Sequence, residues 1–279
     1  MKRLLIAALL CSAASLSFAQ KSINVTTTTV NGKKTTTTTR VNGNDTTTTT
    51  TVSSTDSTKT KSLLYRHKAS KSSGFNFGLT FSRFDLGLTT LIDNGSFTLS
   101  PKNDFLSYRS WKTSDVGFDL LQFGYRFNPG FKVYLSAGFD WTLIRLRKDI
   151  TIQRNAPVLT YVTDSIHFSK NRFSSTYLRL PLSFEFRTRE YSDGKRFRFI
   201  VGPEAGLLLG GRVKQISDEN GKQKFDDDYH FTKVQYGAFT RIGYGSAGLF
   251  AKYYFNDMFE DSPEQAGLKK FAIGLTFGF

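Results

Sequence analysis

The stretch LKKFAIGLTFGF, Leu268–Phe279, decides the fold class because its side chains alternate with a period of two. The large apolar residues at every second position are Phe271, Ile273, Leu275, Phe277 and Phe279. The positions between them hold mostly small or polar residues. A period of two gives a single strand one apolar face and one non-apolar face. In a membrane barrel the apolar face contacts lipid and the other face lines the interior.

Earlier segments of the chain show the same alternation, and the connections between them follow a regular order. The pattern predicts strands at about 74–90, 111–127, 131–147, 173–188, 195–213, 230–243, 246–256 and 268–279. Long and short connections alternate along this series, which is typical of transmembrane barrels, and single-chain bacterial barrels have an even number of strands. We therefore predict an all-β fold, an eight-stranded antiparallel up-and-down transmembrane β-barrel over residues 74–279, with four long loops facing outward.

Charged residues on the predicted strands fall mainly on the face that points away from lipid. In lipid each would cost about 2–4 kcal/mol at the membrane centre, whereas inside a narrow barrel the charges can pair. Asp119 breaks the alternation of its strand, and either a β-bulge there or a position above the bilayer would explain it. The residues that we expect to form a charge network in the lumen are Arg126, Asp140, Arg179, Glu185, Arg198, Glu204, Arg241 and Lys252.

The first twenty residues, MKRLLIAALLCSAASLSFAQ, have the features of an export signal. A positively charged start and the apolar run Leu4–Leu10 precede a small-x-small site, Ser17-Phe18-Ala19. We predict a signal peptide over 1–19, cleaved between Ala19 and Gln20, and export to the outer membrane. Cys11 leaves the alternative of a lipoprotein acylated at that residue. Cleavage after Ala19 would remove the single cysteine of the chain and exclude disulfides and thiolate metal sites.

Residues 20–73 form a Thr-rich arm and linker between the signal peptide and the predicted barrel. The arm has almost no large apolar residues, so burial cannot offset its ordering entropy, and we predict a disordered periplasmic arm. Threonine tracts and Asn-Gly pairs also favour strands and tight turns, which leaves short fluctuating hairpins as an alternative. A glycosylated stalk is another, because Asp45-Thr46-Thr47 and Asp56-Ser57-Thr58 resemble a bacterial acceptor sequence.

Six short motifs follow one another along residues 74–279. They are Ser110-Trp111-Lys112, YLRLPL at 177–182, GPEAG at 202–206, RIGYG at 241–245, AKYY at 251–254 and IGLTFGF at 273–279. In this order they resemble the PorT-like outer-membrane β-barrel family of Gram-negative bacteria. The resemblance implies an exported eight-stranded barrel without indicating one function, although one named relative is linked to the secretion of other proteins. The final strand also resembles the signal recognised by the barrel-assembly machinery, carried here by the five apolar residues of Leu268–Phe279.

The sequence offers little support for catalysis or for a bound cofactor. His67, His167 and His230 lie in the linker and in two different loops, and their neighbours do not have the spacing of a nucleophile and its base. Asp226–Asp228 could supply oxygen ligands to a divalent cation, but a solvated loop is the favoured interpretation. We therefore predict that the protein is not an enzyme, with no catalytic residue, no cofactor and no metal site.

The formal net charge of +15, from 38 Lys and Arg against 23 Asp and Glu, does not favour a nucleic-acid partner because the cations are spread over arm, loops and lumen. Expected partners are outer-membrane lipid, lipopolysaccharide, the barrel-assembly machinery during biogenesis, and an unidentified envelope protein. Basic loop residues suit anionic lipid headgroups. Those that we expect to contact lipopolysaccharide are Arg145, Arg147, Lys148, Arg154, Lys170 and Arg172.

Three functions fit this interpretation of the sequence. The first is a non-enzymatic structural or interaction role through the four outward loops. The second is an accessory role in protein secretion or envelope transport that acts through the periplasmic arm. The third is small-molecule binding at the outer mouth of the barrel. The sequence alone does not choose among them.

Overall fold

The structure of the chain is a computed structural model that describes residues 22–30, 33–42, 45–54, 74–79, 83–191 and 194–278. The chain divides into two compact units, Met1–Ser72 and Ser73–Phe279. The predicted cleavage site at Ala19 and Gln20 lies outside the described residues, as does Phe279. Within the described ranges, no helix is long and apolar enough to cross a membrane.

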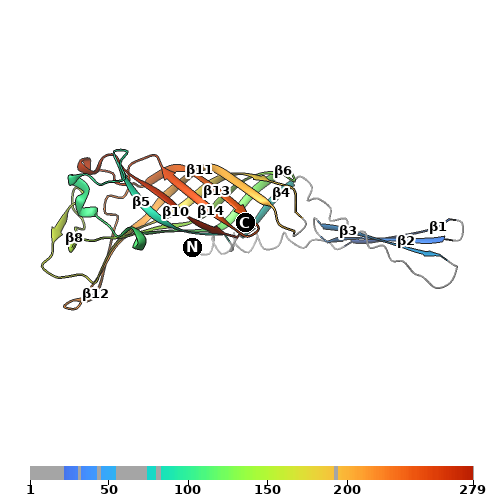
Figure 1. The fold of residues 1–279 in the computed structure, drawn as a ribbon, viewed down its shortest axis with the longest axis horizontal. Helices are drawn as coiled ribbons and strands as arrows, with labels where there is room; N and C mark the ends of the chain where they lie inside the picture. Colours follow the sequence, from blue (N-terminus) through green and yellow to red (C-terminus); the bar gives the residue numbers. More distant parts are fainter. Residues whose placement is uncertain are drawn as a thin grey trace, which may run out of the picture. The chain divides into compact units, whose positions relative to one another are not determined.

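The described part of the first unit is a three-stranded antiparallel sheet, coloured blue in Figure 1. Its strands are β1 (Ser22–Val30), β2 (Lys33–Asn42) and β3 (Asp45–Ser54), and β2 pairs with both neighbours. The strands correspond to the hairpin alternative rather than to the favoured expectation of disorder. Threonine, the most frequent residue of these strands, has a high strand propensity. Both connections are two residues long, as in tight hairpins.

The strands of the second unit have the following bounds, in chain order. They are β4 (Gly74–Leu79), β5 (Phe84–Asp93), β6 (Ser114–Asn128), β7 (Phe131–Arg145), β8 (Ile150–Ile152), β9 (Tyr161–Thr163), β10 (Lys170–Arg187), β11 (Phe197–Ser217), β12 (Gly221–Asp227), β13 (Val234–Tyr244), β14 (Ala247–Tyr254) and β15 (Leu268–Phe277). Short 3-10 helices η2 (Pro101–Leu106), η3 (Ser110–Lys112) and η4 (Pro263–Gln265) lie in the long connections.

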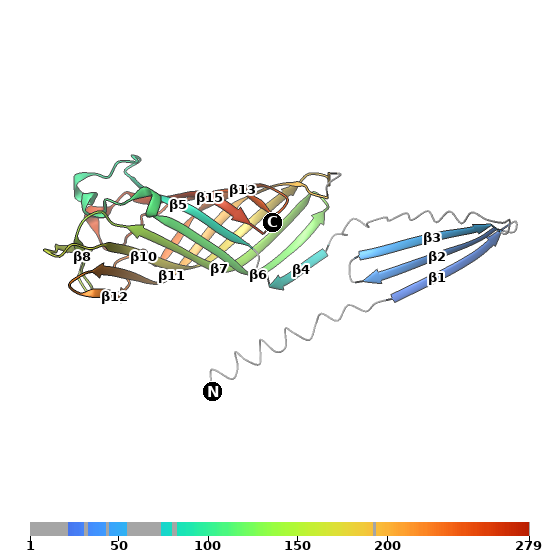
Figure 2. The same ribbon diagram turned by 60° about the horizontal axis from the view of Figure 1, so that its bottom comes forward.

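Eight of these strands close into a ring of antiparallel pairs, as predicted. The order is β10–β7–β6–β5–β15–β14–β13–β11, and pairing of β11 with β10 completes the circle. The final strand β15 lies against β5 with ten residue pairs, from Leu268 opposite Asp93 to Phe277 opposite Phe84. Figures 1 and 2 show the tilted strands of this barrel, with the long loops gathered at one end and the short turns at the other.

The outer face of the ring is apolar and exposed, whereas the inner face is mostly polar and buried. On β15, Ile273, Leu275 and Phe277 are exposed on the outside, and Phe271 is half-buried. Aromatic rings surround the short-turn end. Their contacts run from Phe127 to Phe131 and Phe186, with a second pair formed by Phe197 and Tyr244. Such an aromatic belt is typical of the boundary between membrane and water.

Two irregularities change which residues face the interior. The predicted first strand is divided into β4 and β5, and the alternation of β5 has the opposite phase to that of β4, so that Asp85 faces inward. In β6 the pairing with β7 shifts between Asp119 and Leu121. This β-bulge confirms one of the two explanations offered for Asp119, which is fully buried inside the barrel.

Gly138 on β7 lies opposite Asp119 at this bulge, where the two strands approach closely. A Cβ atom at Gly138 would lie 1.9 Å from the carbonyl oxygen of Phe118. We expect Gly138→Val to destabilise the folded barrel by about 3 kcal/mol, because a side chain there must displace backbone. The measurement is the urea midpoint of the heat-modifiable band after refolding in detergent.

Gly78→Val is the matched control, since nothing lies within 4 Å of a Cβ at Gly78 on β4. Its urea midpoint should stay close to that of the wild type. Equal midpoints for the two valine variants would contradict the tight contact at Gly138.

Candidate functional site: a charged interior, an outer groove and a closed loop end

The middle of the barrel interior is held by Arg179 on β10. Its guanidinium binds Asp85 on β5, with Nη1 2.8 Å from Oδ2, and Asp119 on β6, with Nη2 2.6 Å from Oδ1. Arg241 on β13 binds the same Asp85 oxygen with Nη2 at 2.8 Å. These four side chains are at most 1% exposed. Because the four side chains come from four strands, their ion pairs connect strands that are distant from one another in the sequence.

A second group of ion pairs is centred on Lys252 of β14. Its Nζ lies 2.7 Å from Asp115 Oδ1 on β6 and 2.7 Å from Asp140 Oδ1 on β7. Lys270 of β15 donates to Thr142 Oγ1 at 2.8 Å and lies 3.9 Å from the other oxygen of Asp140. Both lysines therefore sit between acidic or polar partners from other strands.

Charges of opposite sign balance in this layer. The Tyr254 hydroxyl donates to Glu204 Oε1 at 2.7 Å and extends the network to β11. In this middle layer of the interior the buried cations are Arg83, Arg179, Arg241, Lys252 and Lys270, and the buried acids are Asp85, Asp115, Asp119, Asp140 and Glu204. Five positive side chains therefore meet five negative ones. Buried charges need such partners because leaving water is costly, and an eight-stranded barrel has room inside for little besides its side chains.

The short-turn end of the interior contains a separate group around Glu185. Its Oε1 lies 2.5 Å from Arg187 Nε and 3.9 Å from Arg198 Nε. Lys132 donates to Gln122 Oε1 at 3.1 Å. Arg126 is half-buried at this end. The eight residues expected to form one network are thus divided: Arg126, Glu185 and Arg198 lie here, and the other five lie in the middle layer.

Sequence reasoning missed five acids or bases of the middle layer, namely Arg83, Asp85, Asp115, Asp119 and Lys270. The bulge in β6 turns both Asp115 and Asp119 inward, and the break before β5 does the same for Asp85. The only sequence signal was the broken alternation at Asp119. Lys270 occupied the correct face of the last strand, but nothing in that strand distinguished it from its small and polar neighbours.

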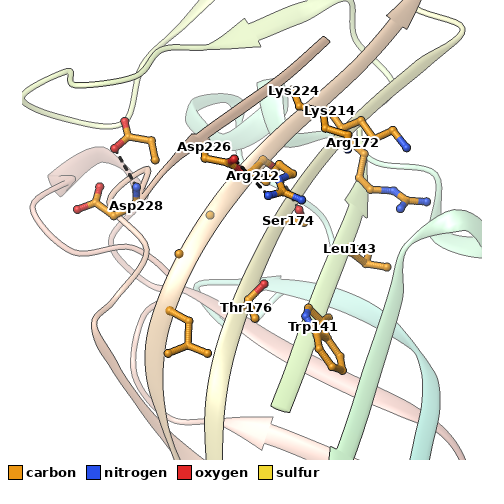
Figure 3. A pocket seen from close by; sticks show the side chains of 14 residues that line it. Trp141, Leu143, Arg172, Ser174, Thr176, Arg212, Lys214, Lys224, Asp226 and Asp228 are labelled. Atoms are coloured by element: carbon orange, nitrogen blue, oxygen red, sulfur yellow. Dashed lines mark hydrogen bonds and ion pairs between the residues drawn. The ribbon is translucent and has the colours of Figure 1, made fainter. Parts of the chain in front are cut away.

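A groove of about 790 Å³ lies on the outer wall of the barrel, near the long-loop end of β7, β10, β11 and β12. Figure 3 shows Trp141 and Leu143 at one end of it and Arg172, Lys214 and Lys224 at the other. Of the basic residues expected at lipid headgroups, Arg172 lines this groove, and Arg145 and Lys170 lie next to it in the sheet. The remaining three bind loop groups: Arg147 contacts Tyr108 O, Lys148 pairs with Asp104, and Arg154 lies over Phe225.

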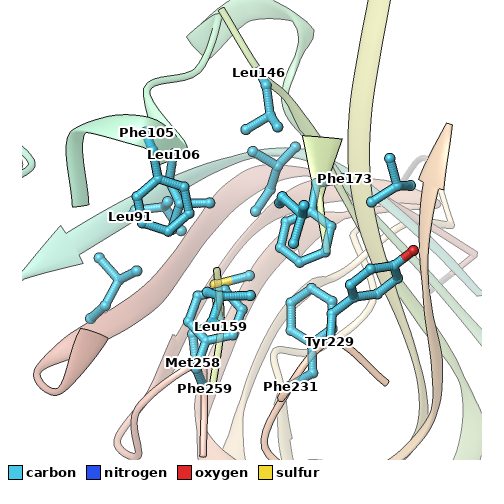
Figure 4. Packing of buried hydrophobic residues seen from close by; sticks show 14 of the residues in the cluster. Leu91, Phe105, Leu106, Leu146, Leu159, Phe173, Tyr229, Phe231, Met258 and Phe259 are labelled. Atoms are coloured by element: carbon cyan, nitrogen blue, oxygen red, sulfur yellow. The ribbon is translucent and has the colours of Figure 1, made fainter. Parts of the chain in front are cut away.

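The long-loop end is closed by an apolar core made from strand ends and loops (Figure 4). At its centre the Phe173 ring stacks on Phe231 at 4.7 Å and meets Tyr229 edge-on at 5.4 Å. The buried members are Leu91, Phe105, Leu106, Ile144, Leu146, Ile150, Ile152, Leu159, Phe173, Val213, Tyr229, Phe231, Met258, Phe259 and Leu268. We call this set the loop core. All four long connections contribute to it.

Hydrogen bonds between different loops fix the loop core further. The Leu159 amide donates to Ser262 Oγ at 3.0 Å, and the Asn155 amide donates to Asp227 Oδ2 at 2.8 Å. Partial burial opposes the charge on Asp149, but hydrogen bonds from the Phe168 amide and His167 hold the pKa of the Asp149 carboxyl below its usual value. The long loops therefore pack together into one folded surface.

One hairpin of this surface exposes apolar side chains. Strands β8 and β9 pair through Ile150–Thr163 and Ile152–Tyr161, and both isoleucines are buried in the loop core. On the outside, Val158 is 43% and Val162 is 51% exposed. The Tyr161 ring, itself 42% exposed, stacks on Phe105 with centroids 4.6 Å apart. We call Val158, Tyr161 and Val162 the hairpin patch.

The histidines of the loops have structural contacts. His167 Nδ1 lies 2.8 Å from Asp149 Oδ2, and His230 Nε2 lies 2.7 Å from Ala156 O. Asp226 pairs with Arg212. Among the residues with described positions, no group of three or more His, Cys, Asp or Glu side chains is arranged to hold a metal ion.

The barrel corresponds to a known family. A family model for the outer membrane protein beta-barrel domain matches residues 74–260, which include seven of the eight ring strands. The chain belongs to this family. The outer-membrane barrel begins with β4, and the family match does not extend over the Thr-rich strands β1–β3. Membership fits the exposed apolar outer face, because in such barrels this face contacts lipid.

Two solved structures of Ail, the attachment invasion locus protein of Yersinia pestis, are also similar to this chain. They are 13% and 15% identical, and each comparison has a TM-score of 0.29 and covers 74% of this chain and 97% of the Ail chain. The second is a complex of Ail with the heparin analogue sucrose octasulfate. No curated protein matches the chain.

We expect Arg179→Met to lower the free energy of unfolding of the outer-membrane barrel by about 3–5 kcal/mol, because it leaves Asp85 and Asp119 with reduced compensation in the interior. The measurement is urea unfolding of the barrel in detergent micelles, followed by the heat-modifiable band.

Arg126→Met is the matched control, because Arg126 is half-buried at the short-turn end and outside the middle layer. Loss of the Arg126 guanidinium should lower the free energy of unfolding by less than about 1 kcal/mol. If both methionine variants lose the same stability, Arg179 has no special role in holding the interior.

Proposed function

We propose that this protein is a non-enzymatic interaction protein of the outer membrane that presents the hairpin patch to a protein partner outside the cell. In this proposal the chain is exported by a signal peptide cleaved after Ala19, and both ends of the barrel chain lie on the periplasmic side. The four long loops then face outward, as in other outer-membrane barrels.

The observation that carries the proposal is the exposed hairpin patch on a fixed base. Val158, Tyr161 and Val162 are apolar and exposed, and they lie on loops outside the apolar wall of the barrel. Exposed apolar side chains away from the lipid-facing wall are typical of protein-binding surfaces. The loop core holds the hairpin in one arrangement, so a partner would meet a surface that is already ordered.

The loop core disfavours small-molecule binding at the outer mouth of the barrel. Phe173, Phe231 and Phe259 pack together where such a ligand would enter from the loop end. A ligand there would have to displace buried aromatic contacts. We therefore favour a partner that binds the outside of the loops.

The test uses a photo-crosslinking amino acid at Thr160, an exposed position between Val158 and Val162. We expect a discrete crosslinked protein in intact cells and at least a tenfold loss of that product in the double variant Val158→Asp and Val162→Asp. Charged groups in the patch would have to be desolvated on binding. The fraction of heat-modifiable barrel should not change.

The control adds the same two negative charges at Ser165, between β9 and β10, and at Gln223 on β12, both of which are exposed polar positions. Ser165→Asp with Gln223→Asp should retain the crosslinked product. An equal loss in both double variants would mean that added charge, rather than the apolar patch, is responsible.

An accessory role in secretion remains the second candidate. It is supported by the resemblance of the barrel to PorT-like proteins and by the three-stranded sheet β1–β3, which gives the arm a structure that envelope machinery could bind. Deleting residues 21–60 separates the two proposals. We expect the barrel to insert and secretion of other proteins to continue at the wild-type level; a secretion defect with normal insertion would favour the accessory role.

A further inference from the structure

Four cations stand side by side across four neighbouring strands at the long-loop end of the outer wall. In the register of the sheet, Arg145 on β7 is opposite Arg172 on β10, Arg172 is opposite Lys214 on β11, and Lys214 is opposite Lys224 on β12. We call these residues the cation row. With strands about 4.8 Å apart, the row extends over about 14 Å. Like charges directly opposite one another repel and destabilise a sheet.

The row is flanked by more positive charge. Two residues farther along the strands, Lys170 and Lys222 both pair with Ile216. On the other side, Arg212 is paired with Asp226 both in register and by an ion pair. On the loop side the cations therefore continue beyond the row, whereas on the side of the barrel wall the next cation is neutralised by an acid.

The acids near the row are already engaged. Asp226 binds Arg212, Asp227 accepts from the Asn155 amide at 2.8 Å, and Asp228 accepts from the His230 amide at 3.2 Å. Within the described residues, the guanidinium of Arg172 and the ammonium groups of Lys214 and Lys224 have no carboxylate within 4.0 Å. Nε of Arg172 is buried and has no hydrogen-bond partner there. The parts of the Arg172, Lys214 and Lys224 side chains that line the groove are therefore available to an external anion.

The apolar end of the groove lies next to the row on the side of the barrel wall. In β7 the outward positions run from Arg145 through Leu143 to Trp141, and in β11 Leu209 lies beyond Arg212. Figure 3 shows this change from charged to apolar side chains within one groove. A molecule that fits must carry negative charge at one end and hydrocarbon at the other.

We propose that the cation row and the groove below it form a binding site for the phosphate-bearing headgroup of lipopolysaccharide in the outer leaflet. The phosphates contact Arg172, Lys214 and Lys224, and the first part of the acyl chains lies against Trp141 and Leu143. An anion at this position relieves the repulsion within the row. The assignment rests on the orientation proposed above, in which the long loops face outside, but it does not depend on the hairpin patch.

The experiment compares lipopolysaccharide binding by the detergent-solubilised full chain, in the presence of a chelator so that divalent ions do not bridge the partners. The variant is Lys214→Gln with Lys224→Gln, and the control is Lys102→Gln with Arg189→Gln, two exposed cations outside the groove. Each pair removes the same charge. We expect the first pair to weaken binding about thirtyfold, because each surface cation contributes roughly one kcal/mol toward anionic lipid. The control should bind as the wild type does.

Three further measurements decide the ligand class. Dephosphorylated lipopolysaccharide should bind the wild type at least tenfold more weakly, and inorganic phosphate at the same phosphate concentration should not compete. Raising the salt concentration should weaken lipopolysaccharide binding more for the wild type than for the Lys214 and Lys224 variant. Equal binding by this variant and the wild type, or equal binding of phosphorylated and dephosphorylated lipopolysaccharide, would overturn the proposal.

Two outcomes would assign the row to another ligand and also reject the lipid site. One is competition by inorganic phosphate alone. The other is equally tight binding of a soluble sulfated polysaccharide that is lost in the Lys214 and Lys224 variant. Heat modifiability of each variant, measured first, ensures that every binding value refers to a folded barrel. Failure of the hairpin crosslink would leave these binding values unaffected, so the two proposals are tested separately.

Discussion

The barrel depends on the pairing of charges across its interior. Arg179 reaches from β10 to Asp85 on β5 and Asp119 on β6, residues separated from it by 94 and 60 positions in the chain. Arg241 and Lys252 make similar connections over 156 and 137 positions. Each pair can form only when the ring is closed in its native register. Removing one partner leaves a buried charge, so the interior favours a single arrangement of the strands.

Apolar residues have two separate roles around this charged layer. On the outer wall they contact lipid, and the inward positions of the same strands carry the charges. At the long-loop end they turn inward and form the loop core around Phe173. The change occurs along single strands: β10 has Arg179 inside the middle of the barrel and Phe173 inside its loop end. The interior is thus polar at one level and apolar at the next.

With the interior filled by side chains, the surfaces that remain for binding are on the outside of the molecule. The hairpin patch and the cation row lie on different parts of the long-loop end and suit different partners, an apolar protein surface and an anionic headgroup. The hairpin patch rests on the loop core and the cation row on the sheet itself. Both are therefore presented in a fixed geometry, which lowers the entropy lost on binding.

The sequence by itself determined the number of strands, their order and most of the outward-facing residues, because a period of two identifies the two faces of a strand. It also placed Asp140, Arg179, Glu204, Arg241 and Lys252 inside the barrel. For the arm the composition predicted disorder and the strand propensity of threonine left short hairpins as an alternative, and the strands β1–β3 correspond to that alternative. Only the tertiary structure decided which residues of different strands meet. A bulge or a break of a few residues reverses the two faces, as at Asp119 and Asp85, and the cation row exists only through the register of four strands. Register depends on closure of the whole ring, and no pattern within a single strand contains that information.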